Sequence, residues 1–133
     1  MDLVSIQPVF NLYNHDWPIF TSHPQLPGAK FTDDATVGES IVCQGSIVSG
    51  GHVERSIVSP GAYVDEHAVV SDSILMNDVV VGPGAIVRRA IVDKAVRVPA
   101  GCQIGVDLDQ DRSRGFTVSE GNVVVIQKGR VLG

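Results

Sequence analysis

A repeat with a period of seventeen residues runs through the middle of the chain. Written in blocks of that length, residues 48–64, 65–81 and 82–98 align, residues 99–104 begin another block, and residues 31–47 fit with one residue deleted. The aligned columns hold aliphatic or small residues: Val53, Val70, Val87 and Ile104; Gly51, Ala68, Ala85 and Cys102; Ile57, Ile74 and Ile91; and Val64, Val81 and Val98. A fixed period of this length is typical of solenoid folds, in which each repeat is one structural unit.

A shorter unit recurs within each block, about every five or six residues. It is a small or aliphatic residue, any residue, and then an aliphatic residue, as in residues 68–70 and 85–87. Alternation over three residues indicates a short strand, and the Gly, Pro, Asp and Ser between the triplets are turn residues. Three strands and three corners make one coil, and stacked coils about 4.8 Å apart bury the aliphatic columns. We therefore expect an all-β fold, a parallel β-helix of about four to five coils, over residues 31–106.

The middle residue of each triplet is expected to face solvent. On this basis Val69 and Ile86 form an apolar stripe on one outer face. Val58, Leu75 and Val92 form a stripe on another. Stacked apolar residues on a surface make a patch, which predicts an interface with another subunit or domain. An ordinary β-rich surface, or cover by the terminal segments, is the alternative.

The two flanks of the repeat differ from it and from each other. Residues 1–30 contain no repeat and are expected to form an extended interdomain linker, pinned by a few large apolar side chains. Residues 107–115 are polar, and we expect a loop there and no helix anywhere in the chain. Residues 116–133 contain two apolar runs around a Glu-Gly-Asn turn, which predicts a β-hairpin that caps or flanks the β-helix.

Charge is unevenly distributed along the chain. The net charge of −5 argues against general nucleic-acid binding. Residues 88–133 nevertheless hold eight basic and five acidic residues, which is compatible with an anion-binding site or with a solvated mixed surface. The two cysteines form no CxxC pair, no signal peptide is visible, and no apolar run approaches the roughly 18 residues of a membrane helix. We expect a cytoplasmic protein with no membrane partner.

The sequence offers few candidates for catalysis or metal binding. The possible bases or ligands are His15, His23, His52 and His67. His52 and His67 are fifteen residues apart, so they do not share a column of a seventeen-residue repeat, and we expect no metal site. Aspartates alternate over residues 107–111, but no glutamate follows at the spacing of a calcium loop. His67 alone remains as a possible catalytic base.

Four segments carry a resemblance to a known family. They read LYNHDWPIFTSHPQLPGAKF, SIVSGG, RRAIVDKAVRVPAGCQIG and DRSRGFTVSEGNVVVI. Together they resemble the C-terminal part of bacterial ADP-glucose pyrophosphorylase, also called glucose-1-phosphate adenylyltransferase, and the RGFTV ending is similar to the actinobacterial branch. The resemblance extends from about Asp2 to about Lys128 and implies that the β-helix winds left-handed.

The resemblance implies a function for the parent protein. An N-terminal nucleotidyltransferase domain of that family makes ADP-glucose and pyrophosphate from ATP and glucose 1-phosphate, with magnesium, at the start of glycogen synthesis. The present chain has none of that domain's motifs, so we expect it to be inactive alone and to hold no cofactor. The family's β-helix packs against its own catalytic domain, helps to form a homotetramer and contributes to allosteric control by anionic small molecules.

The resemblance also implies positions that contact effectors. Lys94, in IVDKA, falls where many relatives carry an effector-contacting arginine, and Lys128 falls where another basic ligand occurs. A third basic residue is expected about four residues later, where this chain has Leu132, with Arg130 two residues away. A lysine in place of an arginine keeps the charge but loses the planar fork that binds phosphate through two parallel hydrogen bonds.

Arg88 and Arg89 are further candidates, because a corner that holds them near Lys94 would attract phosphate by charge. The main hypothesis is a regulatory and oligomerisation domain whose effector contacts are Lys94, Lys128, Arg130, Arg88 and Arg89. A free-standing hexapeptide-repeat acyltransferase that uses His67 is the alternative. A purely structural β-helix, with its basic residues merely solvated, is the third possibility.

Overall fold

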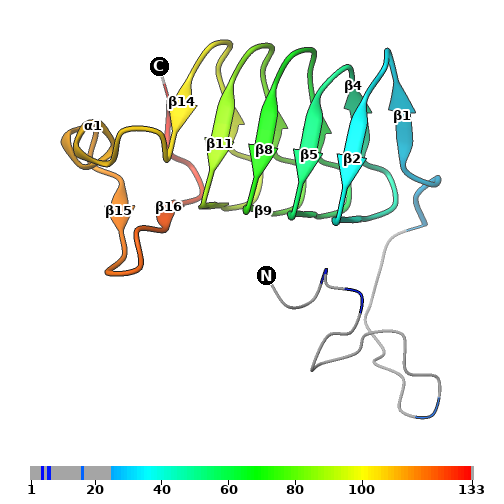
Figure 1. Cartoon of the computed structure of the whole chain (residues 1–133), viewed down its shortest axis with the longest axis horizontal. Coiled ribbons are helices and arrows are strands. Elements are labelled where there is room, and N and C mark those ends of the chain that lie inside the picture. Colours follow the sequence, from blue (N-terminus) through cyan, green and yellow to red (C-terminus); the bar gives the residue numbers. More distant parts are fainter. Residues whose placement is uncertain (1–3, 5, 7–15, 17–24, 133) are drawn as a thin grey trace.

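The chain folds as a β-solenoid whose three sheets form the sides of a prism (Figure 1). The computed structural model describes residues 4, 6, 16 and 25–132. The first sheet contains β1 (Lys30–Thr32), β4 (Ile47–Ser49), β7 (Tyr63–Val64), β10 (Val80–Val81) and β13 (Arg97–Val98). The second contains β2 (Thr36–Gly38), β5 (His52–Glu54), β8 (Val69–Ser71), β11 (Ile86–Arg88) and β14 (Gln103–Ile104). The third contains β3 (Ile41–Val42), β6 (Ile57–Val58), β9 (Ile74–Leu75), β12 (Ala90–Val92), β16 (Val124–Ile126) and β15 (Thr117–Val118).

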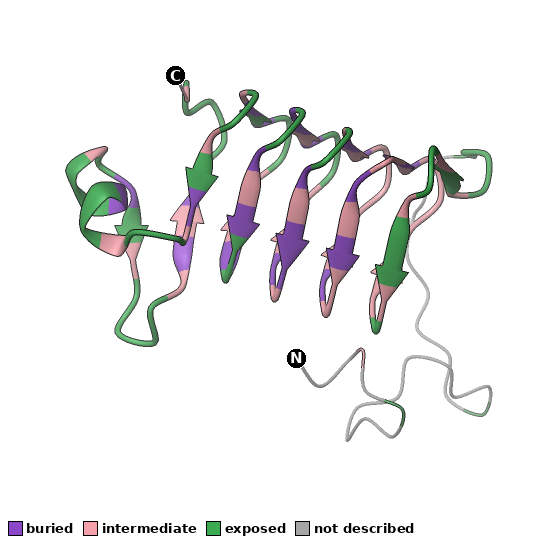
Figure 2. Cartoon of the chain, turned by 45° about the horizontal axis from the view of Figure 1, so that its top comes forward, coloured by how far each residue is buried: buried purple, intermediate pink, exposed green. Residues whose placement is uncertain are grey.

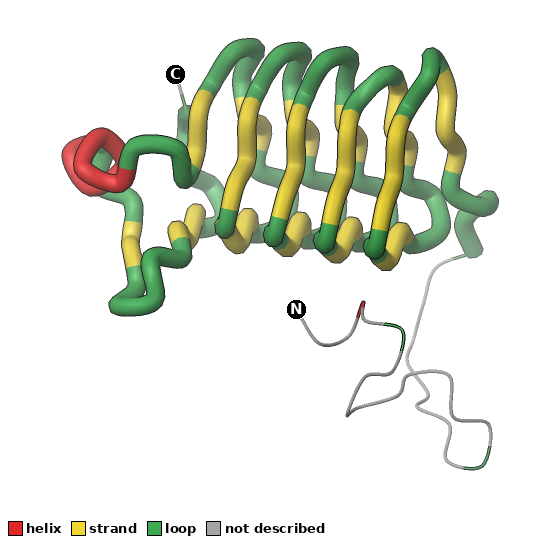
Figure 3. The backbone as a smooth tube through the Cα atoms, in the orientation of Figure 1, coloured by secondary structure: helices red, strands yellow, loops and turns green. Residues whose placement is uncertain are grey.

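Strand pairing follows the repeat. Strands of successive coils pair in parallel, as β10 does with β13 at Val80 and Arg97. In the second sheet the first coil pairs Val37 with Val53, sixteen residues apart, which accounts for the single deletion in the repeat. Short strands joined by tight corners recur along the whole prism (Figure 3). The predicted all-β parallel β-helix is confirmed, while its winding hand stays a prediction from the resemblance.

The core is a set of three inward columns, one from each sheet (Figure 2). Its inward strand residues are Val48, Val64, Val81 and Val98; Val53, Val70, Val87 and Ile104; and Val58, Leu75, Val92 and Ile126, none more than 2% exposed. At about 25 cal/mol per Å² of apolar surface, burial of each such side chain stabilises the fold by about 1.5–3 kcal/mol. Since the side chains of a column stack on those of the neighbouring coils, no coil is stable by itself.

The prediction for the outer stripe on the third sheet is wrong. Val58, Leu75 and Val92 are fully buried, so they belong to the core and cannot form a surface patch in this chain. The residues that face outward from β6 and β9 are Ile57 and Ile74, which are half-buried.

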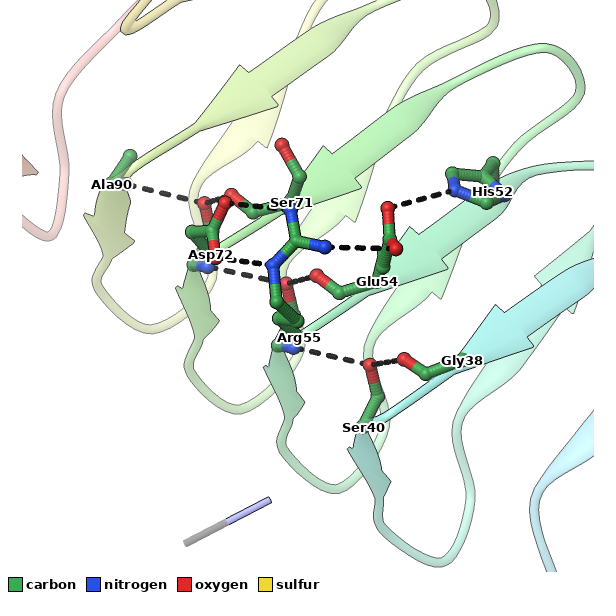
Figure 4. Close-up of polar contacts among 10 residues, drawn as sticks. Gly38, Ser40, His52, Glu54, Arg55, Ser71, Asp72 and Ala90 are labelled. Atoms are coloured by element: carbon green, nitrogen blue, oxygen red, sulfur yellow. Dashed lines mark hydrogen bonds and ion pairs between the residues drawn. The ribbon is translucent and has the colours of Figure 1, made fainter. Parts of the chain in front are cut away.

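Buried serines explain why the predicted inward and outward positions of the third sheet are shifted by one residue. Ser56 and Ser73 occupy the small inward position before Val58 and Leu75, a position that alanine fills in several other triplets, such as residues 68–70 and 85–87. The Ser56 hydroxyl donates to the Glu54 carbonyl at 2.8 Å and accepts the Ser73 N–H at 3.1 Å, and these contacts repeat from coil to coil (Figure 4). A hydroxyl with both partners can be buried at little cost. In the sequence each of these serines resembles a turn residue, and this shifts the expected alternation of inward and outward residues by one position.

An insertion closes the last coil (Figure 1). It lies between β14 and β16 and contains α1 (Leu108–Ser113) and β15. The predicted hairpin is confirmed, because β15 and β16 pair antiparallel. β16 also pairs in parallel with β12, at Val125 and Ile91, so it supplies the third side of the final coil.

The expectation of a loop without a helix in residues 107–115 is wrong. Asp107 caps α1, and its Oδ1 accepts the N–H groups of Asp109 at 3.1 Å and Gln110 at 3.2 Å. Asp111 is fully buried, accepts the Gly105 N–H at 2.8 Å and pairs with Arg114. Six residues are too few for a stable isolated helix, so the cap and the buried carboxylate hold this one in place.

Most of the predicted linker, residues 1–30, lies outside the described residues. Its final part runs beside a corner, where the Gly45 N–H donates to the Pro27 carbonyl at 2.7 Å. The segment that enters β1 is therefore tied to the end of the first coil.

The corrected orientation of the third sheet predicts unequal effects of two neighbouring substitutions. Leu75→Ala removes a fully buried side chain and should lower the free energy of unfolding by about 2–5 kcal/mol. Ile74→Ala removes a half-buried outer side chain and should cost about 1 kcal/mol. Urea unfolding of the two variants would measure both values. A larger loss for Ile74→Ala would contradict the orientation.

Candidate anion-binding site

Lys94 and Lys128 lie side by side at one corner of the solenoid. Lys94 follows β12, and Lys128 follows β16, which pairs with β12 at Val92 and Ile126. Two residues beyond that pair, the same register places Lys128 next to Lys94. The Asp93 carboxylate joins the two segments, since Oδ1 accepts the Lys94 N–H at 2.7 Å and Oδ2 accepts the Lys128 N–H at 3.3 Å. The C-terminal segment therefore does fold back to Lys94.

Asp93 sets the electrostatics of this corner. The Lys94 N–H, the Lys128 N–H and the Lys94 charge hold the pKa of the Asp93 carboxyl below its ordinary value, so it is ionised at neutral pH. The Lys94 Nζ lies 3.5 Å from Asp93 Oδ1. Because this ion pair is exposed to solvent, it holds the ammonium group weakly. Two exposed lysines share one carboxylate, which leaves a net positive charge for an anion.

The structure separates Arg88 and Arg89 from Lys94. They lie at the corner between the second and third sheets, and β12 runs between them and the corner of Lys94. A strand advances about 3.3 Å per residue, so Arg89 and Asp93 are about 13 Å apart along the chain. Arg89 Nη2 also donates to the Gly121 carbonyl at 2.7 Å and so holds the tip of the β15–β16 hairpin. The sequence-based grouping of these arginines with Lys94 does not hold in space.

Arg130 lies in a third place, against the ring of Phe116. Its guanidinium carbon is 5.5 Å from the ring centroid, and that of Arg114 is 4.8 Å from it. Arg130 Nη2 donates to the Arg114 carbonyl. Asp111 neutralises Arg114, whereas no acidic side chain among the described residues pairs with Arg130. Arg114, Phe116, Arg130, Val131 and Leu132 line a cavity of about 190 Å³.

Sequence reasoning missed Asp93 and Arg114 as parts of this region. Asp93 reaches the Lys128 N–H only because β12 and β16 pair in the observed register. That register depends on the length of the insertion between β14 and β16. Arg114 acts through α1, which was not expected. Residues 107–110 read Asp-Leu-Asp-Gln, and a capping aspartate followed by acidic residues in the first turn is a usable helix-start signal.

The histidines form no catalytic arrangement in the described part of the chain. His67 is exposed at a corner with a φ of 56°, and its side chain has no hydrogen-bond partner among the described residues. His52 Nδ1 lies 3.0 Å from Thr36 Oγ1, and Nε2 lies 3.6 Å from Glu54. His15 and His23 lie outside the described residues. Within the residues that are described, no group of three or more potential ligands is placed to hold a metal ion.

A charged network beside the serines is structural in character (Figure 4). Arg55 Nε and Nη2 donate to Asp72 Oδ1 at 2.8 Å and Oδ2 at 3.1 Å, and Nη1 lies 2.8 Å from Glu54. The hydrogen bonds from Arg55 lower the pKa of the Asp72 carboxyl, and Asp72 raises the pKa of Arg55 in turn. The network links neighbouring coils, and its cation is already paired, so it offers no free charge to a ligand.

The outward orientation predicted for Val69 and Ile86 is confirmed. They pair in register on β8 and β11 and are half-buried on the outer face of the second sheet. Their assignment to an interface stays a prediction. In the described part of the chain no helix has the length and apolar character to cross a membrane.

Comparison with known proteins places this geometry in a family. A family described as GlmU-like, C-terminal hexapeptide, matches residues 27–126. The chain belongs to this hexapeptide family. Proteins named glucose-1-phosphate adenylyltransferase are similar to it: 54% identical over 134 residues in Frankia casuarinae (97% of this chain, 32% of the relative), 52% over 129 in Cutibacterium acnes (97% and 32%) and 50% over 137 in an Arthrobacter species (99% and 30%). The chain thus spans about a third of the length of these relatives. The resemblance to glucose-1-phosphate adenylyltransferases seen in the sequence is confirmed.

Proposed function

We propose that this hexapeptide domain is the regulatory and oligomerisation part of a glucose-1-phosphate adenylyltransferase. The relatives that it matches along almost its whole length carry that name, and it spans about a third of them. The parent enzyme would make ADP-glucose and pyrophosphate from ATP and glucose 1-phosphate, with magnesium and ATP held by a catalytic domain outside this chain. The chain alone would then be inactive and would work through contacts with that domain and with other subunits.

The effector would be an anionic small molecule held by Lys94 and Lys128. The observation that carries this proposal is the Asp93 carboxylate, which accepts the backbone N–H of both lysines and so keeps them at one corner. Both lysines are exposed, and the Lys94 ammonium group is only weakly countered by Asp93, so a phosphate can approach both side chains. Arg88 and Arg89 are left out, because they lie at another corner.

Loss of either lysine should weaken the response to effectors. In the full-length enzyme, Lys94→Ala and Lys128→Ala should each raise the effector concentration for half-maximal response at least about tenfold, since a hydrogen bond to a charged group contributes about 1.5–3 kcal/mol. Activity assays over a range of effector concentrations would measure this.

Lys30→Ala is the matched control for that experiment. Lys30 is an exposed lysine in β1, at the other end of the solenoid, and its loss should leave both basal activity and the response unchanged. If the curves of Lys94→Ala and Lys128→Ala coincide with that of Lys30→Ala, the effector assignment is wrong, and the basic residues are merely solvated.

The outer stripe on the second sheet would form part of a subunit or domain interface. Ile86→Glu places a charge in the stripe of Val69 and Ile86 and should reduce the mass of the full-length oligomer in analytical ultracentrifugation. Gln103→Glu adds the same charge one coil further on the same face, at a position that is already polar, and should leave the mass unchanged. Identical masses for both variants would place the interface elsewhere.

A further inference from the structure

The guanidinium of Arg130 lies in a socket formed by the three residues between α1 and β15. Its Nη2 donates to the Arg114 carbonyl, and its carbon lies 5.5 Å from the centroid of the Phe116 ring. Gly115, between these two residues, has a φ of 82°, in the left-handed region that favours glycine. A side chain at Gly115 would meet Nη2 of Arg130 and displace it. The absence of a side chain at this position therefore makes room for the guanidinium.

The socket is fixed to the last coil of the solenoid. Arg114 Nη2 donates to the Gln103 carbonyl of β14 at 2.6 Å and pairs with the buried Asp111 carboxylate. Asp111 in turn accepts the Gly105 N–H, directly after β14, at 2.8 Å. Phe116 is 8% exposed and packs in the hydrophobic core. A side chain that binds in the socket is therefore held in a fixed place relative to the coils.

Arg130 also closes the tight turn that carries Lys128. The Arg130 N–H donates to the Gln127 carbonyl at 3.2 Å, so Lys128 and Gly129 are the central residues of a β-turn. Gly129 has a φ of 80°, which is typical of the second central residue of a type II turn. At one end the turn continues from β16, which pairs with β12. At its other end, the Arg130 side chain enters the socket.

The other contact that holds this turn is weak. The Lys128 N–H lies 3.3 Å from Asp93 Oδ2, which is longer than a usual N–H···O bond. Residues 127–130 are all exposed, and they follow the last residue of β16 that pairs with β12. An exposed segment with few contacts opens easily. A second attachment is needed to keep Lys128 beside Lys94, and the socket of Arg130 supplies it.

We propose that Arg130 is a positioning residue, which anchors the turn of Lys128 to the last coil and does not itself bind the effector. Only the consequence for effector binding rests on the function proposed above, because the order of the turn can be measured without any anion. Direct binding of the effector by Arg130 fits less well, since one of its donors is used by the Arg114 carbonyl and its guanidinium lies by the Phe116 ring.

The order of the turn is the first measurement. ¹⁵N relaxation of the 133-residue chain, in a buffer without phosphate, should give order parameters near 0.85 for the amides of Lys128 and Gly129. Arg130→Gln should lower both to below about 0.6. Phe116→Leu, which removes the ring but no charge, should lower them as well. Arg112→Gln is the matched control, because Arg112 is an exposed arginine of α1 that pairs with Asp109, and it should change nothing.

Titration with inorganic phosphate at constant ionic strength is the second measurement, followed at the Lys128 amide. Arg130→Gln and Phe116→Leu should each raise the dissociation constant about fivefold, and Arg112→Gln should leave it unchanged. The amide signals of the three sheets report whether each variant keeps its fold.

Unchanged order of the turn in Arg130→Gln would overturn the proposal. It would also be overturned if Arg130→Gln weakened phosphate binding while Phe116→Leu did not, because Arg130 would then be a ligand. Loss of order in both variants, with no phosphate binding by the unmodified chain, would support the anchoring role and contradict the effector assignment of the lysines instead.

Discussion

The stacking of inward side chains from one coil onto the next is the interaction on which this structure depends. Parallel ladders set the coils about 4.8 Å apart, a spacing at which aliphatic side chains of equal size are in contact. The two ends differ accordingly. Phe31 and Val37, in the first coil, are 49% and 38% exposed, whereas Ile104 and Ile126 in the last coil are fully buried. The insertion with α1 and β15 accounts for this difference, because it covers the last coil (Figure 2).

Regular stacking leaves the corners as the places where chemistry can vary. Inward positions accept only small or aliphatic residues, or serines whose hydroxyls are satisfied by the backbone. Corner side chains leave the prism and meet their counterparts in the next coil. One corner pairs Arg55 with Asp72 and is structural. Another brings Lys94 to Lys128 around Asp93 and leaves positive charge free. The basic C-terminal third of the chain is therefore divided among several separate places.

The sequence was sufficient for the parts of the fold that repeat. A period of seventeen predicts the coils, their parallel pairing and most of the core, because register depends only on spacing. It failed where a residue's role depends on its partners. Ser56 resembles a turn residue until its hydroxyl is seen to bond to the backbone. Arg89 resembles a neighbour of Lys94 until β12 is seen between them. The resemblance to the adenylyltransferases singled out Lys94 and Lys128, but their proximity required the return of β16 to β12.

β16 completes the last coil in register with β12, and the lysine corner depends on this pairing. Nuclear Overhauser effects between the two strands test it most directly, because in a parallel pair they join only residues at fixed positions. Contacts are expected between Ile91 and Val125 and between Val92 and Ile126. The corner contact between Asp93 and the amide proton of Lys128 should accompany them. A register shifted by one residue, or no contact between these strands, would contradict the claim and remove the basis for a shared lysine corner.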